Sequence, residues 1–192
     1  MNATARLLRA ANPEPPRCLG LRLRPYSLGH DIILTALDNA LLQGKRDIND
    51  LLIAVFICAQ PHEAWSKWCG SFWLPVFLRV WGLFLRRCNW IESFAIFEDY
   101  LQQGRSCPEV NVPVRDQRNS PATPWQQRLK LFLVMKMGLT EADALARPLA
   151  LSHEDWCAAG EMEGVLNLLN DHDRAFLDFH AARCRAEQPQ NN

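Results

Sequence analysis

The residues whose types and spacing come closest to chemistry are a histidine and a cysteine in the last third of the chain. His153 and Cys157 lie four residues apart, so on a helix they would share one face, as two zinc ligands do. A zinc site needs two more ligands at short spacing, and the sequence contains no C-x-x-C pair to supply them. We therefore expect no metal and no cofactor.

Catalysis by other groups has equally little support. A nucleophilic pair of Cys157 and His153 would lack any recognisable nucleophile motif, and the acidic residues are single or capping carboxylates without a paired setting. Gly20 and Gly29 stand alone, so there is no phosphate-binding glycine loop. The sequence predicts a protein that is not an enzyme. The alternative, an enzyme that uses Cys157 or His153, would show selective thiol reactivity at neutral pH.

Charge and cysteine content narrow the class of partner. The 192 residues include 21 basic and 21 acidic ones, so no net charge attracts the protein to nucleic acid. The most apolar stretch, residues 72–85, is shorter than the roughly 20 residues that cross a bilayer. The seven scattered cysteines are typical of reduced thiols, and the N-terminus lacks an apolar signal sequence. We expect a cytoplasmic protein with protein partners, without nucleic acid or membrane partners.

The pattern of apolar and turn residues predicts a mainly α, compact multi-helix domain with at most a short N-terminal β-strand or minimal hairpin. Residues 1–18 form an expected flexible arm, residues 19–186 a single helical domain and residues 187–192 a disordered tail. The alternation over residues 19–24 predicts a strand. Its best partner within the chain is residues 110–112, and otherwise it pairs with another molecule.

Helix caps and helix-breaking residues divide the domain into segments. The cap residues Ser27, Asp47, Asn89, Thr123, Thr140 and Ser152 precede the expected helices. Residues 71–87 are apolar on almost all sides, which is typical of a central helix covered by the rest of the core. The expected helices are 28–43, 47–59, a short segment at 61–69, 71–87, 89–103, 123–137, 140–147, one that begins at Ser152 and one over 171–186, with a long loop at 105–122.

Tryptophan is the most distinctive residue of the chain, with seven copies. Trp65 and Trp68 lie in the short 61–69 segment, where both rings cannot easily point inward. Exposed aromatic side chains of this kind are typical of protein interfaces. We interpret Trp65 and Trp68 as partner-binding anchors, in a groove formed with the helices 28–43 and 47–59.

Three segments resemble one known family. The segment Leu23–His30, followed by a helix and by Asp50–Cys58, is similar to the start of the tail assembly chaperones of tailed phages and prophages. The segment Leu139–Leu149, leading into Trp156 and Asn167–Asn170, is similar to the C-terminal pattern of that family. Tyr26 and His30, which lie in the first of these segments, are two further candidate partner-binding residues. The tryptophan-rich region 65–90 and the loop 105–122 depart from the common pattern of the family.

The resemblance implies a non-enzymatic helical protein that binds and solubilises the tape-measure protein and helps to recruit tail-tube subunits during tail assembly. A chaperone of this kind would cover apolar stripes of a helical client in a groove. One alternative is a structural component of a virion or another assembly, in which the same surface would be a permanent interface. A small DNA-binding regulator is a further alternative, which would bind DNA with a steep salt dependence.

Overall fold

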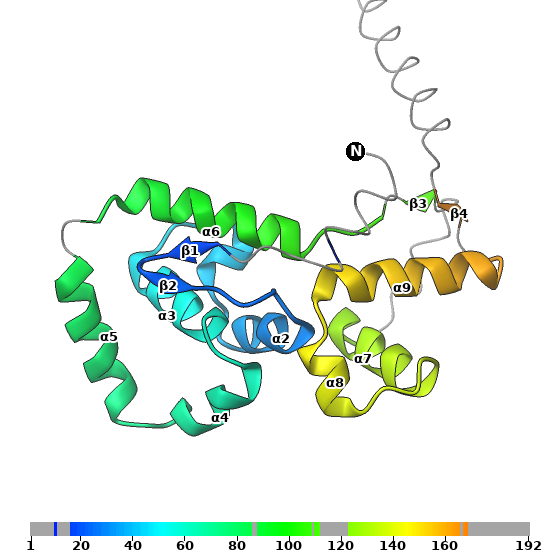
Figure 1. Cartoon of the computed structure of the whole chain (residues 1–192), viewed down its shortest axis with the longest axis horizontal. Coiled ribbons are helices and arrows are strands. Elements are labelled where there is room, and N and C mark those ends of the chain that lie inside the picture. The colour runs from blue at the N-terminus through cyan, green and yellow to red at the C-terminus, as the bar shows by residue number, and fades with distance from the viewer. Residues whose placement is uncertain are drawn as a thin grey trace, which may run out of the picture.

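The computed structural model describes residues 10, 16–85, 88–108, 110–111, 123–165 and 167–168 (Figure 1). It confirms a mainly helical fold with only minimal β-structure. The elements, in chain order, are β1 (Arg17–Cys18), β2 (Leu21–Arg22), α2 (Leu28–Ala36), the 3₁₀ helix η1 (Ala40–Gln43), α3 (Ile48–Cys58), the 3₁₀ helix η2 (His62–Ala64), α4 (Trp65–Trp68), α5 (Trp73–Phe84), α6 (Trp90–Gly104), β3 (Val110–Asn111), α7 (Trp125–Met135), α8 (Glu141–Ala146), α9 (Leu149–Met162) and β4 (Asn167–Leu168).

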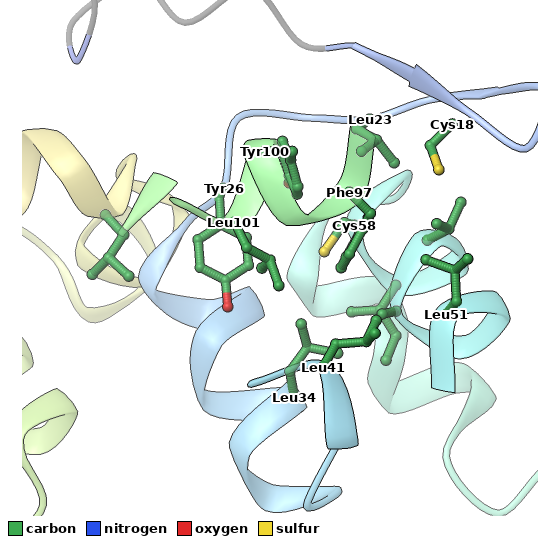
Figure 2. Close-up of a cluster of buried hydrophobic side chains, with 14 of the residues drawn as sticks. Cys18, Leu23, Tyr26, Leu34, Leu41, Leu51, Cys58, Phe97, Tyr100 and Leu101 are labelled. Atoms are coloured by element: carbon green, nitrogen blue, oxygen red, sulfur yellow. The ribbon is translucent and has the colours of Figure 1, made fainter. Parts of the chain in front are cut away.

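The core lies where α2, α3 and α6 meet beneath the β1–β2 hairpin (Figure 2). Helix α3 is apolar on nearly every side and is buried from Leu51 to Cys58 except at Ile53. Phe97 of α6 is the largest fully buried side chain, and it lies in the same cluster as Leu51 and Leu34. The hairpin adds Cys18 and Leu23 to this cluster, so the N-terminal strands close one side of the core.

The prediction that the first strand pairs with residues 110–112 is wrong. Strand β1 pairs with β2 in an antiparallel hairpin, and Val110 pairs with Leu168 of β4 instead. The reason is local: Leu19 and Gly20 both adopt positive φ, at 49° and 81°, which is the geometry of a tight two-residue hairpin turn. Closing this turn costs far less chain entropy than pairing with a segment 90 residues away.

The expected arm and tail lie largely outside the described residues. The arm was predicted to end at residue 18, but Arg17 and Cys18 already form β1. Ala10 and Pro16 are the other residues of the arm that the structure describes. The expected helix over 171–186 and the tail 187–192 lie outside the described residues, as do positions 112–122 of the predicted loop.

Four of the predicted caps are confirmed, but the predicted cap at Thr123 is wrong, because the N-cap of α7 is Pro124 and no side chain caps that helix. One helix also ends earlier than expected. The side chains of Ser27, Asp47, Asn89 and Thr140 each accept a hydrogen bond from the first turn of a helix. The helix expected over 28–43 stops at Ala36. Beyond it, Asn39 accepts from the Leu41 N–H and donates to the Asp50 carbonyl, and these side-chain bonds favour a break before η1.

Helices α7, α8 and α9 form a second group, at the opposite end of the molecule from α5 (Figure 1). A short backbone pairing joins this group to the start of α2: the Leu149 N–H donates to the Tyr26 carbonyl and the Leu28 N–H to that of Arg147. The same pairing fixes the start of α9 at Leu149, so the predicted start at Ser152 is wrong. Ser152 lies inside the helix and donates to the Pro148 carbonyl.

Candidate functional site

The apolar helix α5 is not the central helix that the sequence predicts. It stands at one end of the molecule, between α4 and α6 in the chain (Figure 1), and none of its residues is fully buried. Its inner side packs on the core through Leu78 and Trp81, while Gly82 faces Leu52 of α3. The other helices of the core pack on one another, so they leave the outer side of α5 uncovered.

The outer side of α5 is a continuous apolar surface. At 3.6 residues per turn, its exposed apolar side chains fall within an arc of about 140° that contains no polar residue. Trp73 is 68% exposed and Phe84 is 83% exposed, which is exceptional for aromatic side chains. We call this surface the outer face; it consists of Phe72, Trp73, Val76, Phe77, Val80, Leu83 and Phe84.

The charged residues of the segment that carries the outer face are both positive. Between residues 65 and 85 the chain carries two charged residues, Lys67 and Arg79, and both are exposed. Arg79 lies on one edge of the apolar arc, next to Phe72 and Leu83 on the helix surface. A partner with an apolar stripe and acidic flanks would therefore match this surface in both respects.

The two predicted tryptophan anchors are only partly exposed, and only Trp68 shares a contact with the outer face. Trp68 packs edge-on against Phe56 of α3 with 5.3 Å between ring centroids, and its Nε1–H donates to Gln60 Oε1. Phe77 of the outer face contacts the same Phe56 ring from α5. Trp65 packs against the core cluster. Trp68 therefore continues the outer face, whereas Trp65 mainly holds α4 on the core.

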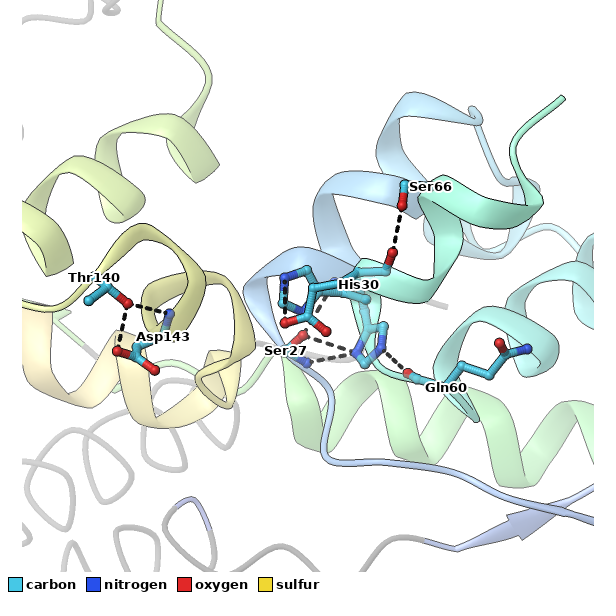
Figure 3. A network of polar contacts seen from close by, with 8 residues as sticks. Ser27, His30, Gln60, Ser66, Thr140 and Asp143 are labelled. Atoms are coloured by element: carbon cyan, nitrogen blue, oxygen red, sulfur yellow. Dashed lines mark hydrogen bonds and ion pairs between the residues drawn. The ribbon is translucent and has the colours of Figure 1, made fainter.

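The other two predicted anchors, Tyr26 and His30, are buried at 3% and 2% exposure. They cannot touch a partner in this structure. The Ser27 N–H donates to His30 Nδ1, so the proton of the ring lies on Nε2, which donates to the Gln60 carbonyl at 2.9 Å (Figure 3). Burial lowers the pKa of His30 to about 4. A neutral His30 thus joins the start of α2 to the end of α3.

His62 anchors the segment that leads to α5. Its ring lies against Gly29 so closely that an added Cβ at position 29 would be 2.5 Å from His62 Cγ. The His62 and His30 rings meet edge-on with 6.4 Å between centroids. The sequence Leu28–His30 therefore has a structural role: Gly29 makes room for the His62 ring, and His30 caps α2 and contacts the same ring.

A buried carboxylate connects the two helix groups. Asp31 has no exposed surface, and it accepts hydrogen bonds from Tyr26 Oη, Arg105 Nε and Gln126 Nε2 at 2.8–3.0 Å. The salt bridge to Arg105 neutralises its charge, and burial together with Asp31 raises the pKa of Tyr26 far above its usual range. Tyr26, Arg105 and Gln126 all donate to the same carboxylate, so the cluster links α2 to α6 and α7.

His153 and Cys157, the residues of the enzyme alternative, both lie on α9. The His153 ring packs at a tilt against Trp125 with 5.4 Å between ring centroids, its Nδ1 lies 3.2 Å from the Ser106 carbonyl, and burial lowers its pKa. Cys157 is buried, and its Sγ lies 4.0 Å from that of Cys107. Within the described residues, no group of three or more histidine, cysteine or acidic side chains could hold a metal ion.

The other described cysteines behave as small apolar residues or surface thiols. Cys18 and Cys58 are buried, which raises their pKa to about 11 and about 12. Cys69 is exposed and Cys88 is half-buried, and all four are free thiols. Cys184 lies outside the described residues. The raised pKa values of Cys18 and Cys58 make these two thiols poor nucleophiles at neutral pH.

No protein-family model, curated protein or solved structure matches the chain. No helix in the described part of the chain is both long enough and apolar enough to span a membrane. The features that bear on function are therefore the ones described above. The strongest of them is the outer face, which the sequence interpretation placed in the core although its all-round apolar pattern is also the pattern of an unpartnered interface helix.

Proposed function

We propose that the protein is a non-enzymatic phage tail assembly chaperone, which binds an apolar helical segment of the tape-measure protein in the cytoplasm and keeps it soluble until the tail tube forms around it. The observation that carries this proposal is the outer face of α5. Monomeric proteins rarely leave a continuous apolar patch of this size uncovered, and such patches mark sites of protein binding. The resemblance of Leu23–His30 and Leu139–Leu149 to the chaperone family supplies the identity of the client.

The chemistry of the surface suits such a client. A tape-measure protein is a long helical chain, and an unassembled helix exposes an apolar stripe that repeats every three to four residues. The outer face offers a stripe with the same repeat, with Trp68 extending it on one side. Lys67 and Arg79 would meet acidic residues at the edges of the client helix. Recruitment of tail-tube subunits would use a different surface, because the client occupies this one.

The test is an affinity pull-down of the tagged full chain from cells that co-express its neighbouring genes, with the bound proteins identified by mass spectrometry. We expect the tape-measure protein to be recovered with the wild type and lost with Val80→Asp, which places a charge in the centre of the outer face. Met135→Asp is the matched control, since Met135 is a highly exposed apolar residue on α7 at the far end of the molecule. Failure of the wild type to retain the tape-measure protein would contradict the proposal.

The alternative of a structural component makes a different prediction about the same surface. A permanent subunit would be found in purified particles in fixed proportion to the other tail proteins, whereas a chaperone is absent from them. Mass spectrometry of purified particles therefore separates a transient from a permanent use of the outer face.

A further inference from the structure

The size of the outer face raises the question of what covers it before a client arrives. Large aromatic side chains each bury about 150–250 Å² when they are covered, so the exposed fractions of the seven residues together amount to on the order of 700 Å². A specific protein interface buries about 800 Å² on each partner. One outer face is therefore about as large as one side of a stable interface.

The shape of the stripe also suits pairing with itself. Trp73, Val76, Val80 and Leu83 follow one another at steps of three, four and three residues, which is the spacing of the apolar seam between two paired helices. A surface that is apolar throughout complements its own copy, as a two-fold symmetric interface requires. Arg79 lies at the edge of the arc, where water can screen it, rather than in the seam.

We propose that, in the absence of a client, the outer face of α5 pairs with the outer face of a second copy of this chain, so that the protein is stored as a two-fold homodimer. The dimer hides the aromatic side chains from water and from unspecific partners. Client and second copy then compete for the same surface, so binding of one client helix releases one protomer from the dimer. The competition rests on the proposed function, whereas the dimer itself does not.

The dimer is tested on the purified full chain alone, by sedimentation velocity over a concentration series from about 1 to 100 μM. We expect a dimer for the wild type and for Met135→Asp. We expect Val80→Asp and Phe84→Asp to be monomers over the same range, with association weakened at least about 100-fold because each places an unpaired carboxylate in the apolar outer face. Circular dichroism of each variant checks that the helical fold is intact.

A wild-type monomer at 100 μM would overturn the inference, as would a dimer that both outer-face variants leave unchanged. Failure of this inference differs from failure of the proposed function. A monomer that still retains the tape-measure protein removes the dimer and keeps the chaperone. A dimer that dissociates on Val80→Asp but never retains the tape-measure protein keeps the dimer and removes the chaperone.

Discussion

Phe77 of α5 and Phe56 of α3 lie with their ring centroids 5.2 Å apart, and this contact holds the apolar helix on the core. The same Phe56 ring also supports Trp68, so a single buried side chain positions both α4 and α5. Phe77 therefore fixes the outer face on the core, while Trp73 and Phe84 of the same face remain largely exposed.

Shortening Phe77, the α5 side chain that contacts Phe56, should weaken the packing of α5 on the core. We expect Phe77→Ala to lower the free energy of unfolding by about 1–2 kcal/mol, less than for a fully buried phenylalanine because Phe77 is partly exposed. Phe84→Ala on the same helix should change it by less than about 0.5 kcal/mol, because Phe84 is almost fully exposed. Urea unfolding, at a protein concentration where the chain is monomeric, measures the free energy of unfolding of both variants. Equal effects of the two changes would contradict the described packing of α5.

The contact between Gly29 and His62 predicts opposite effects for the same substitution in two helices. Gly29→Ala should destabilise the protein by at least about 2 kcal/mol, since the new Cβ would lie 2.5 Å from His62 Cγ and η2 must shift. Gly82→Ala should be neutral or stabilising by up to about 1 kcal/mol, because its nearest neighbour is at 3.5 Å and alanine favours a helix. Thermal unfolding of the two variants makes the comparison. A harmless Gly29→Ala would show that His62 does not anchor this segment.

The lowered pKa of His30 makes stability depend on pH in a defined window. The pKa of His30 is about 4 in the folded protein and 6.5 in the unfolded chain. Between these two values, the unfolded state binds a proton that the folded state does not bind. Above pH 6.5, neutral His30 makes its full contribution to the free energy of unfolding. This contribution, about 3 kcal/mol, is lost as the pH falls towards 4.

The measurement is urea unfolding of the wild type and His30→Gln at pH 7.0 and 4.5. The half-buried His153 contributes with the same sign in both proteins, so the comparison isolates His30. The wild type should lose more stability than the variant between these two pH values. An equal loss would mean that His30 is not held neutral by its burial against Gln60.

The ion pair of the buried Asp31 should contribute far more to the free energy of unfolding than an exposed ion pair does. We expect Asp31→Asn to cost about 3 kcal/mol of unfolding free energy, because it leaves the half-buried Arg105 without its counter-charge. Glu98→Gln is the control: it removes an equally short but exposed pair with Arg46 and should cost less than about 1 kcal/mol. Chemical unfolding of both variants tests this, and similar costs would contradict a structural role for the Asp31 cluster.

Much of the fold could be predicted from local signals. Ser27, Asp47, Asn89 and Thr140 cap helices because their side chains satisfy backbone N–H groups within three residues, which sequence alone reveals. The start of α9 could not be predicted in this way, because the long-range pairing of Leu149 with Tyr26 fixes it. The break after Ala36 likewise depends on Asp50, which lies in another helix.

The candidate site was predicted only in part. The aromatic residues of the short segment led to Trp68, which does adjoin the outer face. The larger surface was missed because a helix that is apolar on all sides is usually buried, and the sequence does not show that no other element covers α5. Tyr26 and His30 were chosen as partner contacts from a motif, but their polar groups are used within the fold.

The most direct test of the chaperone account is the solubility of the tape-measure protein when it is co-expressed with this chain. We expect the wild type and Met135→Asp to raise the soluble fraction of the tape-measure protein several-fold over its expression alone, and Val80→Asp to give no increase. Quantitative immunoblots of the soluble and pelleted fractions measure this ratio, with each variant present at equal level. A soluble fraction that is the same with the wild type, with Val80→Asp and without the chain would contradict the account.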